Sequence, residues 1–330
     1  MALKHFSAKI LIFLCAFLLA DTILHTQDSS AAIVKKKKVA PRVLHMKKKL
    51  AHRMPPSITS MKNYSSLVVN ADTGKILHQI HANETRHPAS LTKMMTLFLT
   101  FEAIKSGHLS MEQKLPVSAL AARQPRTNMG LSTGETISVK DAIYSLTVHS
   151  ANDASIVLGE AISGNSVKFV HTMNVKAKQL GMKNTTFKNP SGLPHPQQVT
   201  TAYDMARLAL ALKRDYKEFY PMFSITSFNF RGREVNTHNG VMLRYPWADG
   251  LKTGYVNASG YNVVTSAKKP EGNLIAVVMG GPTSKARDDH TIHLLETAYH
   301  KLSTRRVAQL TTTPKDIFSI ADSTKSDVTR

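Results

Sequence analysis

The sequence is poor in cysteine, in acidic residues and in aromatic residues. Of its 330 residues one is cysteine, and 22 Asp and Glu face 43 Lys and Arg, for a formal net charge of +21. A single cysteine excludes an internal disulfide framework and the cysteine-rich zinc modules. Aromatic residues make up 7% of the chain and are sparse among the basic runs, which argues against a nucleic-acid partner. The excess charge instead favours an anionic membrane surface, wall polymer or substrate.

The sequence also lacks the residue spacings that are typical of metal-binding motifs. The 15 histidines form no His-Glu-x-x-His pair, the helical zinc motif. The cluster of acidic residues and histidines at 288–293 is more typical of a helix surface than of a metal site. We therefore predict no metal and no cofactor.

No apolar run reaches the length of about 20 residues that a membrane-spanning helix needs. The apolar run at 10–20 follows Lys4 and Lys9 and precedes small residues at 29–32. This order is typical of a secretion signal. We predict a signal peptide over 1–32, cleaved near its end, with an uncleaved anchor as the alternative. The protein would then cross the inner membrane and remain periplasmic or associated with the cell envelope.

A basic segment follows the predicted signal. Residues 1–54 contain 11 Lys and Arg against two Asp, which leaves +12 of the net charge of +21 for the rest of the chain. Dense like charge that ends at Pro55 and Pro56 indicates a disordered linker over 33–60. The run at 33–54 is either a solvated spacer or an electrostatic tether to an anionic membrane or wall surface, where each basic residue contributes about 1 kcal/mol.

Residues 61–304 are predicted to form one folded domain that mixes strands and helices. Two apolar runs flank a turn at 71–75, which favours a hairpin. Residues 111–135 are expected to be irregular, and the Thr-, Ser- and Asp-rich residues 305–330 to be a disordered polar tail. Strands are predicted at 65–70, 76–80, 223–230, 252–255, 261–267 and 274–279, and helices at 90–105, 138–148, 152–162, 167–180, 201–213 and 289–302.

The chain is organised around residues 88–93. Ser90 and Lys93 stand three residues apart where the pattern changes to helix, so they share one face of the helix start. This spacing brings an amine within reach of a hydroxyl. Free backbone N–H groups at a helix N-terminus also bind anions. Serine acyl transfer needs a hydroxyl, a base and such an anion site, so this Ser-x-x-Lys is a candidate catalytic motif.

Two further motifs follow, Ser-Ala-Asn at 150–152 and Lys-Thr-Gly at 252–254. The three together are the signature of penicillin-binding proteins and related β-lactamases. Their surroundings, His-Pro-Ala-Ser-Leu-Thr-Lys-Met at 87–94, Ser-Ala-Asn-Asp-Ala at 150–154 and Asp-Gly-Leu-Lys-Thr-Gly-Tyr at 249–255, closely resemble the D-alanyl-D-alanine carboxypeptidase family of low-molecular-mass penicillin-binding proteins. The resemblance covers roughly residues 60–300.

The resemblance implies a catalytic role for four residues. Ser90 would be the nucleophile that forms an acyl-enzyme, and Lys93 would be its base. Lys93 must then be uncharged, which requires burial or a neighbouring cation to lower its pKa. Ser150 would relay a proton to the leaving amine. Asn152 would donate to the substrate amide and hold the base.

The resemblance assigns the third motif to substrate binding. Lys252 would be the neighbouring cation, and would hold the terminal carboxylate of the substrate together with the Thr253 hydroxyl. Gly254 would leave room for the substrate to lie along a strand edge. The backbone N–H groups of Ser90 and Tyr255 would hold the oxyanion.

A fold and partners are also implied. The fold would be mixed α/β of the β-lactamase/transpeptidase type: an antiparallel sheet flanked by N- and C-terminal helices, plus an all-helical subdomain, with the active site between them. The substrate would be a peptidoglycan stem peptide ending in D-Ala–D-Ala, and β-lactam antibiotics would be covalent inhibitors. We expect neither the β-rich C-terminal domain nor the amphipathic anchor that many relatives append, because few residues follow the last predicted helix.

The predicted activity is removal of the C-terminal D-Ala from the pentapeptide. Three alternatives stay open: a D,D-endopeptidase that cuts crosslinks, a class A-like β-lactamase and a non-catalytic envelope-binding protein. The β-lactamase needs a Glu between the second and third motifs to activate water. Glu160, Glu218 and Glu234 are the glutamates there, and none has Glu-x-x-x-Asn spacing, which disfavours that alternative.

Overall fold

The computed structural model describes residues 58–311. The predicted signal peptide (1–32), the basic run (33–54) and residues 312–330 of the predicted tail lie outside the described residues, so what was predicted for them stays a prediction. Between residues 58 and 311, no helix is both long and apolar enough to cross a membrane.

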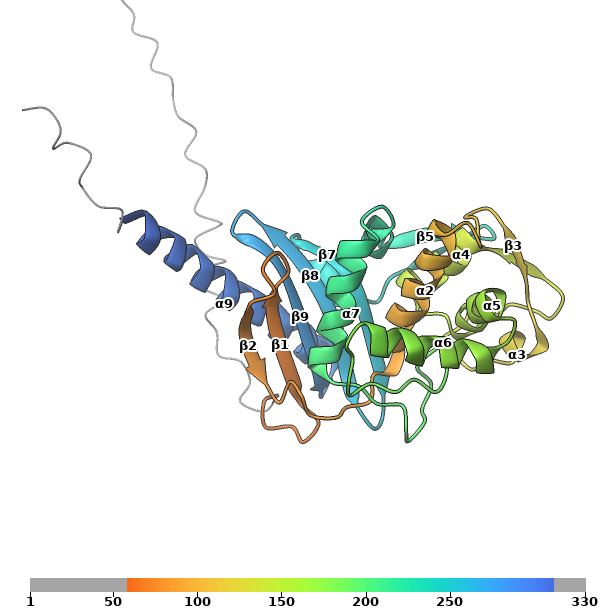
Figure 1. Cartoon of the computed structure of the whole chain (residues 1–330), viewed down its shortest axis with the longest axis horizontal. Helices are drawn as coiled ribbons and strands as arrows, with labels where there is room; N and C mark the ends of the chain where they lie inside the picture. Colours follow the sequence, from red (N-terminus) through yellow and green to blue (C-terminus); the bar gives the residue numbers. More distant parts are fainter. Residues whose placement is uncertain (1–57, 312–330) are drawn as a thin grey trace, which may run out of the picture. The chain divides into compact units, whose positions relative to one another are not determined.

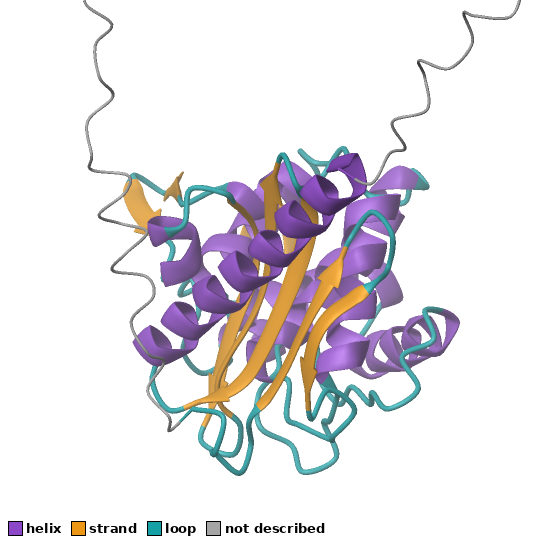
Figure 2. Ribbon diagram, turned by 90° about the vertical axis from the view of Figure 1, so that its left-hand side faces the viewer, coloured by secondary structure: helices purple, strands orange, loops and turns teal. Residues whose placement is uncertain are grey.

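A five-stranded antiparallel sheet lies at the centre of the fold (Figures 1 and 2). Its order is β2-β1-β9-β8-β7, so the first hairpin of the chain joins the last three strands through β1 and β9. The register there pairs Leu67 with Val277. The predicted hairpin and C-terminal strands are confirmed. The strands are β1 (Ser65–Asn70), β2 (Ile76–Ile80), β7 (Ala248–Val256), β8 (Gly260–Lys269) and β9 (Gly272–Gly281).

Helices cover both faces of this sheet. In β9 successive residues belong to two separate hydrophobic clusters, with Val277 in one and Val278 in the other. Because side chains alternate between the two faces of a strand, both faces of β9 are buried. Helix α7 (Ala202–Asp215) packs on one face and α9 (Ser284–Thr311) on the other (Figures 1 and 2).

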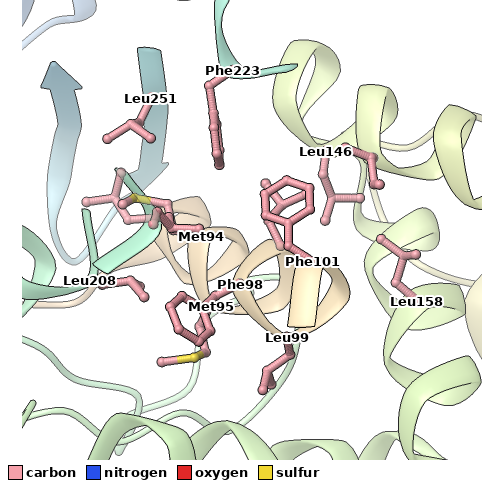
Figure 3. Close-up of a cluster of buried hydrophobic side chains, with 14 of the residues drawn as sticks. Met94, Met95, Phe98, Leu99, Phe101, Leu146, Leu158, Leu208, Phe223 and Leu251 are labelled. Carbon is pink, nitrogen blue, oxygen red and sulfur yellow. The ribbon is translucent and has the colours of Figure 1, made fainter. Parts of the chain in front are cut away.

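The helix that follows the first motif is buried on all sides. Most residues of α2 (Lys93–Lys105) are inaccessible to solvent, and a helix that is apolar all round must be enclosed by other elements. The helices between residues 119 and 179, with the loops that join them, are called the helical part below. Figure 3 shows Leu208 of α7 and Leu251 of β7 on one side of α2, and Leu146 and Leu158 of the helical part on the other. Helix α2 therefore joins the sheet to the helical part.

The helical part lies beyond α2 from the sheet (Figure 1). Ser138 caps its helix α4 by accepting from the Asp141 N–H, and Thr201 caps α7 in the same way, both as predicted. Residues 145–149 add a π-helical segment, η2. The remaining elements are α3 (Ala119–Ala122), α4 (Val139–Tyr144), η2 (Ser145–His149), α5 (Asn152–Ser163), α6 (Ser166–Gln179), α8 (Gly240–Arg244), and the paired strands β3 (Lys114–Pro116) with β4 (Thr136–Ser138) and β5 (Ser227–Phe230) with β6 (Arg233–Asn236).

Several predicted boundaries were wrong. The helix expected from Ser90 begins as a 3-10 segment, η1 (Ala89–Thr92), and becomes α-helical at Lys93. The strand expected over 223–230 starts only at Ser227, because 3-10 segment η3 (Tyr220–Ser224) precedes it. A proline at the start of η3 has the φ of a helix and no N–H for a sheet. The irregular region 111–135 contains β3, which pairs with a strand just beyond it.

The C-terminal helix is longer than predicted. It starts at Ser284, ahead of the expected start at 289, and runs to Thr311, past the predicted domain boundary at 304. The residues past 304 were predicted as a tail from composition, and composition alone did not reveal that the helix continues through them.

Candidate active site

Ser90 lies in η1, at a point where the backbone is unusual. Ala89, just before it, has a φ of +50°, in the left-handed region that costs a residue with a side chain about 1 kcal/mol. Two glycines let neighbouring segments pack against this backbone. A Cβ at Gly192 would lie 1.9 Å from the Ala89 carbonyl oxygen, and one at Gly254 would lie 2.9 Å from the Ser90 nitrogen. Two other segments therefore press directly against Ser90 and fix its position.

Lys93 makes three contacts through its side-chain amine. Nζ lies 3.0 Å from Ser90 Oγ, 2.8 Å from Asn152 Oδ1 and 2.5 Å from the Ser191 carbonyl oxygen. The amide and carbonyl oxygens can only accept hydrogen bonds, whereas a hydroxyl can also donate. An uncharged amine has two N–H groups, which match these two oxygens. Its lone pair is then left for the hydroxyl hydrogen of Ser90.

The surroundings of Lys93 favour that uncharged form. The side chain is fully buried. Burial lowers the pKa of Lys93 well below its ordinary value, and the nearby charge of Lys252 lowers this pKa further, while the carboxylate of Asp153 acts in the opposite direction. Desolvation disfavours a charged amine most when no counter-charge touches it, and none of the three contacts of Lys93 is a carboxylate.

The second motif begins where η2 ends, at Ser150. Its φ is +65°, and this left-handed turn is held by the Thr127 hydroxyl, which donates to the Ser150 carbonyl oxygen at 2.9 Å. The Ser150 Oγ is buried and has no hydrogen-bond partner among the described residues. Leaving a buried hydroxyl unpaired costs about 1–3 kcal/mol. An unpaired hydroxyl of this kind indicates a group reserved for a ligand.

The third motif lies on β7, the edge strand of the sheet that passes Ser90. Lys252 and Thr253 are buried, and Lys252 Nζ donates to the Thr253 carbonyl oxygen at 3.0 Å. Burial lowers the pKa of Lys252 to about 7, and the neighbouring charge of Arg287 contributes to the shift. The Tyr255 side chain is half exposed.

The three motifs meet at one cleft of about 380 Å³. The structure thus brings the predicted site residues together. Lys93 and Lys252 are buried and lie behind the lining, in contact with Ser90 and Thr253. The predicted residues that line the cleft are Ser90, Ser150, Asn152, Thr253, Gly254 and Tyr255.

Three basic residues of this cleft were missed from the sequence. Arg287, on α9, is buried and donates to the Asn262 carbonyl oxygen at 2.9 Å. His238 also lines the cleft, and its burial, followed by the charge of Lys252, lowers its pKa to about 4. Arg126 is an exposed residue of the lining. No motif surrounds these residues, so the sequence carried no signal for them.

The fold and the meeting of the three motifs define the class of protein. An antiparallel sheet joined to a helical part, with Ser-x-x-Lys, Ser-x-Asn and Lys-Thr-Gly at their junction, is typical of penicillin-binding proteins. A family model described as D-alanyl-D-alanine carboxypeptidase matches residues 47–283. The chain therefore belongs to the D-alanyl-D-alanine carboxypeptidase family.

Individual relatives agree with this assignment. The chain is 38% identical over 252 residues to the D-alanyl-D-alanine carboxypeptidase DacF of Bacillus subtilis, an alignment that covers 73% of this chain and 63% of DacF. It thus spans less than two thirds of the length of that relative.

Solved structures show the same fold. The D-alanyl-D-alanine carboxypeptidase DacD of Francisella tularensis superposes with a TM-score of 0.68 at 29% identity, over 76% of this chain and 74% of that one. Penicillin-binding protein D2 of Listeria monocytogenes, in a cefotaxime-bound form, gives 0.66 at 29% identity, over 71% and 96%.

Proposed function

We propose that the protein is a serine D-alanyl-D-alanine carboxypeptidase, which removes the terminal D-Ala of peptidoglycan pentapeptide. One observation carries the proposal: the buried amine of Lys93 lies 3.0 Å from Ser90 Oγ, while its two other partners are oxygens that can only accept. The uncharged amine therefore presents its lone pair to the hydroxyl, as a general base must. Membership of the family supports the same activity.

In the proposed reaction Lys93 takes the proton of Ser90 while Oγ bonds to the carbonyl carbon between the two D-Ala residues. The carbonyl oxygen becomes negative and is held by the backbone N–H groups of Ser90 and Tyr255. The C–N bond then breaks. The leaving amine takes a proton from Lys93 through the Ser150 hydroxyl, and an ester remains on Ser90. Water cleaves this ester with Lys93 again as base. The unpaired, buried Ser150 Oγ supports the relay.

The terminal carboxylate of the substrate would bind at the β7 side of the cleft. Lys252 and Arg287 are basic residues buried there, Thr253 lines the cleft, and Arg287 is already paired with Asp288, with 2.6 Å between Nη2 and Oδ1. Hydrogen bonds between charged groups are roughly twice as strong as neutral ones. A free carboxylate next to the leaving amine is therefore required for binding, which favours a carboxypeptidase over a general peptidase.

β-Lactam antibiotics are the proposed covalent inhibitors of the same serine. Attack of Ser90 on the lactam carbonyl would open the ring and leave an ester, and the ring carboxylate would occupy the place of the peptide carboxylate. Structures of the similar Listeria protein carry cefotaxime and ampicillin, which supports this part of the proposal.

The test is release of D-alanine from an acylated tripeptide ending in D-Ala–D-Ala, together with labelling by a fluorescent penicillin. We expect wild type to do both and Ser90→Ala to do neither. Lys93→Met should lower the acylation rate by at least about a hundredfold, since a general base contributes 10²–10⁴-fold. Ser132→Ala, at an exposed serine outside the cleft, is the matched control. Equal labelling of wild type and Ser90→Ala would reject the assignment.

The same assay addresses the endopeptidase alternative. A crosslinked dimer of stem peptides offers the same chemistry at a longer leaving group, so the groups described above would serve both reactions. We expect faster cleavage of the pentapeptide. Faster cleavage of the dimer would favour the endopeptidase.

We further propose that the protein acts in the cell envelope and that residues 33–54 bind it to an anionic surface. The charge of this run supports the proposal, because each basic residue near an anionic leaflet contributes about 1 kcal/mol. Deletion of 33–54 should weaken sedimentation with cell envelopes at low salt and leave D-alanine release unchanged. Unaltered sedimentation would reject the tether.

A further inference from the structure

The segment around Arg126 is fixed to the second motif on both sides. Asn152 Nδ2 donates to the Pro125 carbonyl oxygen at 2.9 Å, and the Asn152 backbone N–H donates to the Thr127 carbonyl oxygen at 2.7 Å. The Thr127 hydroxyl donates in turn to the Ser150 carbonyl oxygen. The backbone before and after Arg126 is therefore held in a constant position relative to Asn152.

The Arg126 side chain takes no part in this network. It is exposed, lines the cleft and makes no hydrogen bond or ion pair with any residue between 58 and 304. A guanidinium carries five N–H donors and keeps its charge at every physiological pH. Arg123, three residues earlier, is also exposed but does not line the cleft. A rigid segment thus presents one unpaired cation to the cleft, and preorganised groups lose less entropy on binding.

The substrate described so far has no group that would pair with Arg126, because its one carboxylate is assigned to other residues. No Asp or Glu is among the residues that line the cleft. Lys252 and Arg287 lie on the sheet side and are assigned to the terminal carboxylate. Arg126 belongs to the helical part, on the wall that carries Asn152. A substrate with a single carboxylate would leave Arg126 unpaired.

We propose that Arg126 is a specificity-determining residue that binds a second carboxylate of the substrate, carried by the residue directly before D-Ala–D-Ala. The inference rests on the proposed function. With the terminal carboxylate at Lys252, the scissile carbonyl would lie over Ser90, and the preceding residues would extend away from that end past Asn152. The residues on either side of Arg126 are hydrogen-bonded to Asn152 at this point of the cleft. Its planar fork fits a carboxylate through two parallel hydrogen bonds.

The test uses two tripeptides that differ in one carboxylate. Both end in D-Ala–D-Ala after an acylated diaminopimelic acid, whose side-chain carboxylate is free in one peptide and amidated in the other. We expect wild type to show a kcat/KM about tenfold higher for the free acid, the size of effect that one charge-assisted hydrogen-bonded pair produces. Arg126→Gln should lose this preference, with less than a twofold change on the amidated peptide. High salt should reduce the preference of wild type.

Two variants and a second outcome make the test decisive. Arg123→Gln removes the same charge outside the cleft and should keep the preference, while Arg126→Lys should keep part of it. An equal loss of activity on both peptides in Arg126→Gln, or an absent preference in wild type, would overturn the inference. Release of D-alanine without preference overturns this inference alone, whereas no release from either peptide overturns the proposed function as well.

Discussion

At the scale of single residues, the proposed mechanism needs two buried lysines in opposite charge states. In the proposed mechanism Lys93 acts when uncharged, while Lys252 must be charged when it holds the substrate carboxylate. Burial lowers the pKa of both, and that of Lys252 falls to about 7. The free protein therefore exchanges a proton at Lys252 near neutral pH, and an anion that binds there favours the protonated form.

This proton sets the expected pH dependence. Above the pKa of about 7, most molecules carry an uncharged Lys252, so binding of the carboxylate must take up a proton. We predict that kcat/KM falls above pH 7, by up to tenfold per pH unit, and that the fall appears mainly in KM. Lys252→Arg stays charged and should lose this decline, although its absolute rate drops because a rigid fork replaces a point charge. Rates measured from pH 6 to 9 check the prediction; the same decline in both proteins would contradict it.

Residue spacing explains which parts of the site were predictable. Ser90 and Lys93 are three apart, and local helix geometry alone brings them together. Arg287 reaches the cleft, and the Ser191 carbonyl reaches Lys93, from other elements, and only the assembled fold places them there. The carbonyl is also present in every residue, so no side-chain pattern can mark it.

At the scale of elements, β7 passes so close to η1 that Gly254 has no room for a side chain. A Cβ at Gly254 would lie 2.9 Å from the Ser90 nitrogen and 3.2 Å from the Ala89 Cβ. We predict that Gly254→Ala shifts Ser90 and lowers penicillin acylation at least about tenfold, because small misplacements of reacting groups cost up to about 10²-fold. Stopped-flow acylation with the fluorescent penicillin measures the effect.

Gly74 provides the matched control. It lies in the turn between β1 and β2 with a φ of +71°, and a Cβ there meets no atom within 4 Å. Gly74→Ala should therefore lower the unfolding free energy by about 1 kcal/mol and leave acylation unchanged. Unchanged acylation in Gly254→Ala would contradict the prediction, because β7 and η1 would then accommodate the methyl group without displacing Ser90.

Element types were predictable where periodicity and caps act locally. Ser138 and Thr201 accept from backbone N–H groups three residues on, as their sequences indicate. The short pair β3–β4 and the start of α9 at Ser284 were not predicted. Three-residue strands carry too few residues to show a period, and tertiary contacts decide whether they form.

For the whole molecule, we expect stability to depend on the packing of α2 against the elements around it. Phe101 is fully buried; its ring stacks on Phe219 at 5.0 Å between centroids and meets Phe223 edge-on at 6.0 Å. We predict that Phe101→Ala lowers the free energy of unfolding by about 3–5 kcal/mol, the usual cost of removing a core phenylalanine. Urea denaturation followed by circular dichroism gives this value. Leu243→Ala, at a leucine that is 60% exposed, should change it by less than about 0.5 kcal/mol.

The contact between Lys93 and Ser191 determines which substitutions position 191 tolerates. The acceptor is a peptide oxygen, and every amino acid at position 191 supplies one. A residue that fits the buried space of the Ser191 side chain therefore leaves the amine with its acceptor. A bulkier residue at Gly192, where the Ala89 carbonyl leaves no space, would instead displace the loop and move this acceptor away from the amine.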